Sequence, residues 1–121
     1  GSFPNFSAVC EYLITQNKPV ILGCAGWKDR VNIEDTLFAG AVIRRIRDHF
    51  SIQDDSSNIA ETLYVNAQND LFGFLKDKNA THYQRLTGFG LEIDLRYCLS
   101  PDVANILPFY ENERLAIRRM R

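Results

Sequence analysis

The spacing of apolar residues along the chain predicts helices that alternate with one short strand and end in a hairpin. Apolar residues recur every three to four positions over Phe6–Gln16, which predicts a helix capped by Asn5 or Ser7. A break at Asn17 follows, and the uninterrupted apolar run Pro19–Gly23 then predicts a short strand that is buried on both faces.

The middle of the chain predicts four further helices. The first begins after Asn32, which is suited to cap it, and extends from Ile33 to about Phe50. Its first half, Leu37–Ile43, is apolar or small on every side, so we expect it to be buried on most sides. The pattern then predicts a polar loop at 51–58 and helices at about 59–76, 79–88 and 90–99.

The C-terminal segment predicts a β-hairpin. Two strand-like runs, 105–110 and 114–117, flank a turn at Glu111-Asn112, and Pro108 limits its strand to a sheet edge. The predicted fold class is therefore α/β, as a layered α/β/α arrangement of helices around a small sheet with a C-terminal hairpin. The predicted sheet has only this hairpin and one further strand, which is few strands for so many helices. We therefore expect the single domain 1–121 to belong to a larger fold.

Composition narrows the functional classes. The 121 residues are 45% hydrophobic and carry a formal net charge of −1, which is typical of a folded domain and argues against a nucleic-acid-binding surface. The apolar runs are too short to cross a membrane. The three cysteines lie far apart and form no metal-binding pair, which favours a reduced, cytoplasmic setting.

The segment Gly23–Thr36 carries the clearest chemical signal. It follows the predicted strand and enters a helix, which is where α/β sheets bind ligands. Gly26 allows close approach of the backbone, while Lys28 and Arg30 suit phosphate or sulfonate oxygens. Glu34 and Asp35 are adjacent carboxylates of the kind that bind Mg²⁺.

Purely structural roles would explain the same residues equally well. Acidic side chains in a first helical turn complement the helix dipole, and Asn32 with Asp35 would also serve as a cap pair. Cys24 either acts as a nucleophile or, in the interpretation that we favour, packs as a small buried apolar residue. Trp27 either forms a wall of a pocket or covers the sheet.

The same segment closely resembles the central signature of the 2-phosphosulfolactate phosphatase family. Gly1–Asn5 is similar to the family's small-Ser-Phe-x-Asn turn, and Gly90–Glu92 with Asp94 and Cys98 is similar to its C-terminal pattern. The residues that carry the central resemblance are Cys24–Lys28, Arg30, Glu34–Leu37 and Ala39–Ala41.

The resemblance implies a Mg²⁺-dependent phosphatase that hydrolyses 2-phospho-3-sulfolactate to 3-sulfolactate, a step toward coenzyme M. The substrate class is a small phosphorylated sulfonate or carboxylate. The implied catalytic residues are Lys28, Arg30, Glu34 and Asp35, the last two as metal ligands. The implied substrate-binding residues are Ser2, Asn5, Cys24, Gly26 and Trp27.

Family members are about twice as long as this chain and carry an N-terminal acidic signature that does not occur in it. We therefore expect the chain to be the C-terminal part of a two-part α/β phosphatase, incomplete without an N-terminal half. An apolar face exposed without that half predicts self-association into a homo-oligomer. Two alternatives remain open: a non-catalytic module that binds a phosphorylated metabolite, and a hydrolase that depends on Cys24.

Overall fold

A computed structural model describes residues 1–119, so residues 120–121 of the predicted domain lie outside the described part. Its described elements are a short 3₁₀ helix, six α-helices and two strands. In chain order they are η1 (Phe3–Asn5), α1 (Phe6–Gln16), α2 (Ile33–Ile46), α3 (Asp55–Ala67), α4 (Leu71–Asp77), α5 (Thr81–Gly88), α6 (Glu92–Cys98), β1 (Ile106–Glu111) and β2 (Arg114–Arg119).

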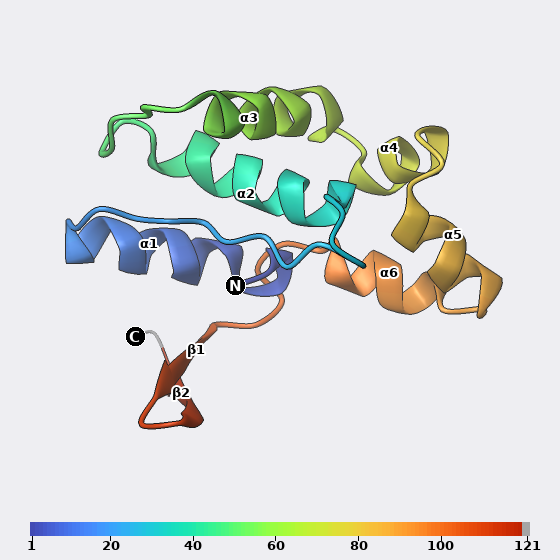
Figure 1. Cartoon of the computed structure of the whole chain (residues 1–121). Coiled ribbons are helices and arrows are strands. Elements are labelled where there is room, and N and C mark those ends of the chain that lie inside the picture. The colour runs from blue at the N-terminus through green and yellow to red at the C-terminus, as the bar shows by residue number, and fades with distance from the viewer. Residues whose placement is uncertain (120–121) are drawn as a thin grey trace.

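Helix α2 lies at the centre of the molecule. In Figure 1, α3 runs along one side of it, α1 lies on the other side, and α4 to α6 gather at one end. The predicted burial of the Leu37–Ile43 stretch is confirmed, since all but one of these residues are buried. A Cβ atom at Gly40 would overlap the carbonyl oxygen of Ala60 on α3, so this glycine allows the two helices to pack closely.

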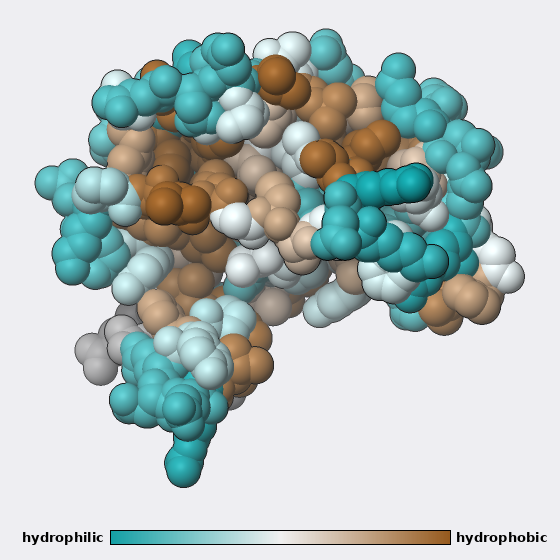
Figure 2. All heavy atoms as spheres, in the orientation of Figure 1, coloured by the Kyte–Doolittle hydropathy of each residue, from teal (hydrophilic) through white to brown (hydrophobic). Residues whose placement is uncertain are grey.

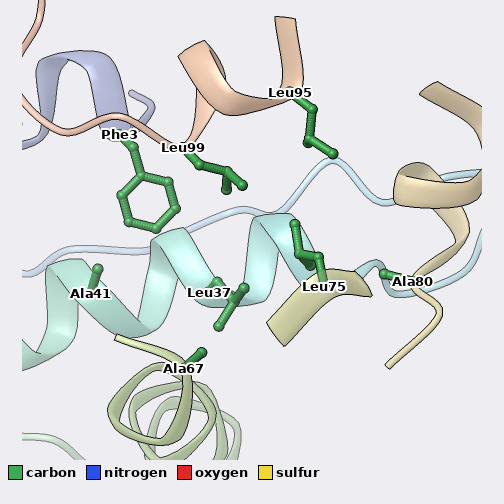
Figure 3. Close-up of a cluster of buried hydrophobic side chains, with 8 residues drawn as sticks. All are labelled: Phe3, Leu37, Ala41, Ala67, Leu75, Ala80, Leu95 and Leu99. Atoms are coloured by element: carbon green, nitrogen blue, oxygen red, sulfur yellow. The ribbon is translucent and has the colours of Figure 1, made fainter. Parts of the chain in front are cut away.

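The main hydrophobic core joins segments from the whole chain. Its eight buried side chains converge from η1, α2, α3, α4, α6 and the connecting loops (Figure 3). Leu37 and Leu75 are fully buried at its centre. The members of this core are Phe3, Leu37, Ala41, Ala67, Leu75, Ala80, Leu95 and Leu99.

The helix predictions are confirmed at some boundaries and wrong at others. The helix at Phe6–Gln16 forms as predicted, and the next begins at Ile33 but ends at Ile46 rather than near Phe50. The single helix predicted over 59–76 is two helices, because the Asp70 side chain accepts a hydrogen bond from the Gly73 amide and starts α4. Residues 55–58 belong to α3 rather than to a loop, since Asp54 caps that helix.

The predicted α/β class with a C-terminal hairpin is confirmed. Strands β1 and β2 pair in antiparallel register, with Pro108 opposite Ile117. The turn lies one residue later than predicted, at Asn112 and Glu113, whose φ angles of 50° and 61° are both left-handed. Tyr12 on α1 packs against Phe109 on β1, with ring centroids 5.0 Å apart.

The strand predicted at Pro19–Gly23 does not form within residues 1–119, and the hairpin is the only sheet there. This segment has no neighbouring strand with which to exchange backbone hydrogen bonds. Its predicted burial is also wrong at Ile21, which is 96% exposed. Across the same residues, every helix is too short or too polar to span a lipid bilayer.

Candidate functional site

The loop between the extended segment and α2 folds into a tight turn. Trp27 and Arg30 exchange two backbone hydrogen bonds, with N···O distances of 2.9 and 3.1 Å. Lys28 and Asp29 form the turn between them, with left-handed φ angles of 51° and 57°. This geometry leaves the side chains of Lys28 and Arg30 exposed to solvent at the surface of the molecule.

Asp35 holds this loop against the first turn of α2. Its Oδ2 accepts hydrogen bonds from the Gly26 amide at 2.7 Å and from Asn32 Nδ2 at 2.9 Å. Asn32 Oδ1 in turn accepts from the Asp35 amide at 2.9 Å and caps the helix. The cap pair is confirmed, and Asp35 has a structural role in addition to any role with a metal.

Glu34 contacts α5. His82 Nδ1 lies 3.0 Å from Glu34 Oε1, and the side chains of both residues are largely buried. Glu34 Oε2 and His82 Nε2 are buried with no hydrogen-bond partner among residues 1–119. Burial raises the pKa of Glu34 above its ordinary value, although a backbone hydrogen bond and His82 oppose that effect.

Trp27 forms the centre of a positively charged cluster. The guanidinium carbon of Arg85 lies 4.1 Å from the centroid of its ring, and Lys28 Nζ lies 5.9 Å from it. His82 contacts the same ring edge-to-face at 5.7 Å. His82 therefore touches both Trp27 and Glu34, and it connects the cations to the buried carboxylate.

Sequence analysis missed His82 and Arg85 as members of this site. They are three residues apart on α5, which places them on one face of a helix that has no buried residue. That spacing is the signal in the sequence, but it does not indicate which loop they meet. Lys28, Arg30 and Arg85 form no ion pair within the described part of the chain, so their charges are available to an anion.

The residues of the N-terminal turn divide into two groups. Asn5 is buried, and its Oδ1 accepts a hydrogen bond from the Ser2 amide at 2.8 Å. Its Nδ2 donates to the Ile106 carbonyl at 2.9 Å, so Asn5 fastens this turn to β1. Ser2, by contrast, lines an open groove that Cys24 and Glu34 also line.

This groove has a volume of about 500 Å³ and lies between α1, α2, α6 and the extended segment 20–25. Asp35 lines it together with Glu34, whereas Trp27, Lys28 and Arg30 do not. Trp27 is 41% exposed and packs on His82 rather than on a sheet. The structure thus separates the predicted site into carboxylates at a groove and cations around Trp27, with His82 between them.

Cys24 lies in the exposed part of the segment, so its predicted role as a buried apolar residue is wrong. The predicted burial depended on a covered strand, and that strand is absent from the described residues. Partial burial raises the pKa of the Cys24 thiol, and the negative charge of Asp35 raises it further. A raised pKa disfavours the thiolate, which is the form that attacks a phosphate ester.

The carboxylates of this site would supply only part of the coordination shell of a magnesium ion. Within residues 1–119, no three His, Cys, Asp or Glu side chains form a metal-binding group. Glu34 Oε2 and Asp35 Oδ1 accept no hydrogen bond there and lie on adjacent residues. Mg²⁺ in phosphoryl-transfer sites is commonly held by one or two carboxylates, with water and substrate phosphate completing the shell.

One family of known proteins matches almost the whole chain. The profile of the family described as 2-phosphosulpholactate phosphatase matches residues 1–113. The chain is 37% identical to a probable 2-phosphosulfolactate phosphatase of Synechocystis sp. over 112 residues, which cover 89% of the chain and 46% of that relative. It is 32% identical to a protein of the same name from Thermotoga maritima over 112 residues, with 93% of the chain and 47% of the relative covered.

A third relative, from Caldanaerobacter subterraneus subsp. tengcongensis, carries the same name and is 31% identical over 113 residues. The match covers 93% of the chain and 46% of that protein. The chain therefore spans about half the length of the curated relatives it matches.

Proposed function

The chain belongs to the 2-phosphosulfolactate phosphatase family, and from this premise we propose that it is the C-terminal part of a two-part α/β phosphatase. The proposed reaction is the Mg²⁺-dependent hydrolysis of 2-phospho-3-sulfolactate to 3-sulfolactate and phosphate, in the synthesis of coenzyme M. The substrate class, a small phosphorylated sulfonate, follows from the names of the relatives.

One observation carries the proposal: a buried carboxylate with a free oxygen, Glu34, is linked through His82 to a cluster of unpaired cations around Trp27. A phosphate ester with a second acidic group requires several positive charges, and its cleavage requires a site for a hard cation. Both kinds of group lie within one continuous set of contacts here.

In this proposal each residue has a defined task. Lys28 and Arg30 attract and orient the anionic groups of the substrate, and Arg85 contributes a planar fork beside them. Asp35 fixes the loop through Gly26 and would offer its free oxygen to the metal, and Glu34 would be the principal carboxylate ligand. When bound, Mg²⁺ would neutralise the negative charge that develops on the phosphoryl oxygens.

The test is phosphate release from 2-phosphosulfolactate by the full-length protein and by this chain, each with magnesium and with a chelator. We expect magnesium-dependent release by the full-length protein, and at least a 100-fold loss of that rate in Glu34→Gln. Normal magnesium-dependent rates in a folded Glu34→Gln protein would refute the metal assignment. Substrate binding without any phosphate release would favour the non-catalytic binding module instead.

A further inference from the structure

The extended segment 19–25 has an unpaired backbone. It runs past α1 and α2 as an extended trace in Figure 1, and none of its residues forms a backbone hydrogen bond within residues 1–119. Its residue Ile21 is 96% exposed. A row of free N–H and C=O groups beside a large exposed apolar side chain is typical of a strand edge that pairs with another strand.

One side of this segment already packs on the domain as a strand would. Leu22 lies against the cluster of Cys10, Val42 and Ile46, which joins α1 to α2. Val20 is half-buried, whereas its neighbour Ile21 is exposed, so the side chains alternate as they do in a β-strand. The segment therefore has the side-chain pattern of a strand and lacks only a partner strand.

The other side of the segment borders the groove of about 500 Å³, whose walls include Val9, Leu13 and Phe38. Figure 2 shows hydrophobic atoms gathered on this face of the molecule, where the segment runs along α1, between α1 and α2, in Figure 1. An apolar surface of this kind is usually covered by protein.

We propose that residues 19–25 form a β-strand that pairs with a strand of the polypeptide that makes up the remaining length of the family members. The relatives are about twice as long as the matched region, so a segment of domain size exists in them to cover this face. A second copy of this chain fits less well, because it would bring the same half-site and no new type of metal ligand.

The pairing would also affect the candidate site, because the groove beside the segment contains its carboxylates. This step rests on the proposed function. Glu34 and Asp35 line the groove, and the described residues bring no third metal ligand to them. Residues 20–25 line the same groove, so a strand docked on this segment borders the two carboxylates. The pairing would thereby cover the open side of the groove and shield Glu34 and Asp35 from bulk water.

Hydrogen exchange measured by mass spectrometry tests the pairing. We expect the amides of residues 20–24 to exchange at about the rate of a free peptide in this chain alone, and at least about 100-fold more slowly in the full-length protein. Fast exchange in both samples would overturn the proposal. Protection that appears in this chain alone and grows with its concentration would overturn it too, because a second copy would then be the partner.

A pair of variants separates docking from general folding. Ile21→Asp should reduce the protection of residues 20–24 in the full-length protein by about tenfold or more, and should leave the thermal midpoint of this chain unchanged. Val31→Asp is the matched control, since Val31 is also exposed, at 86%, but does not line the groove. Equal effects of the two variants would overturn the proposal. The readout is independent of phosphate release, so an inactive protein with protected amides would refute the proposed function alone.

Discussion

His82 Nδ1 lies 3.0 Å from Glu34 Oε1, so a helix late in the chain reaches the first turn of α2. The contact is buried, and the same imidazole packs against Trp27. The adjacent carboxylate, Asp35, holds the loop through the Gly26 amide. Two neighbouring acidic residues that look equivalent in the sequence therefore have different surroundings and different expected roles.

This difference predicts opposite effects on stability. Asp35→Ala removes two hydrogen bonds to a carboxylate oxygen, so we expect it to lower the free energy of unfolding by about 1–3 kcal/mol. Glu34→Gln removes a charge that burial disfavours, so we expect its stability to equal or exceed that of the wild type at neutral pH. Urea unfolding of this chain measures both variants, and a large loss of stability in Glu34→Gln would contradict the prediction.

The pH dependence of that comparison follows from the direction of the shift. Because the pKa of Glu34 is raised on folding above its ordinary value near 4.5, the folded state holds this proton more tightly than the unfolded state does. The contribution of Glu34 to stability is therefore most favourable below about pH 4.5, and declines as the pH rises through the raised pKa. We expect the difference in stability between Glu34→Gln and wild type to grow over that range, in unfolding curves measured at several pH values.

The cluster around Trp27 can be tested by fluorescence, because Trp27 is the only tryptophan in the chain. We expect inorganic phosphate to change its emission, and Arg85→Gln to weaken that binding about 3- to 10-fold, since the guanidinium lies 4.1 Å from the ring centroid. Arg114→Gln is the control, because Arg114 is exposed on the distant hairpin. Equal affinities in the two variants would show that Arg85 takes no part in anion binding.

The packing of α2 on α3 predicts a strong effect at a glycine. Gly40→Ala places a methyl group against the Ala60 carbonyl oxygen, so we expect a loss of about 1–3 kcal/mol or more in the free energy of unfolding. Gly88→Ala is the matched control, because a Cβ there meets no atom within 4 Å. Urea unfolding should leave that variant at or above wild-type stability. Similar losses in both variants would contradict the predicted close approach of the helices.

The thiols can be distinguished by their reactivity. Burial raises the pKa of Cys10 to about 11, so we expect iodoacetamide to label it far more slowly than the exposed Cys24 and Cys98. Because the pKa of Cys24 is raised as well, we expect Cys24→Ser to retain phosphatase activity within about twofold in the full-length protein. Abolition of activity in a folded Cys24→Ser protein would restore the Cys24-dependent hydrolase as the explanation.

Local signals in the sequence predicted several parts of the fold. The helix Phe6–Gln16, the start of α2 at Ile33 and the C-terminal hairpin all follow from periodicity, caps and turn residues that lie close together in the chain. The Asn32–Asp35 cap pair was also visible, because its members are three residues apart. The division of the 59–76 stretch was missed, because one Asp70 cap outweighed an apolar pattern that continued past it.

The sequence by itself determined the family and the α/β class, and it singled out the loop Gly23–Thr36 as a candidate site, because these depend on neighbouring residues and on a local signature. Only the tertiary structure decided which of those residues meet. It brought His82 and Arg85 to the loop at Trp27, tied Asn5 to Ile106 and left residues 19–25 without a partner strand. The physical reason is that such contacts join segments far apart in the chain, and packing of the whole domain, rather than local propensity, places those segments together.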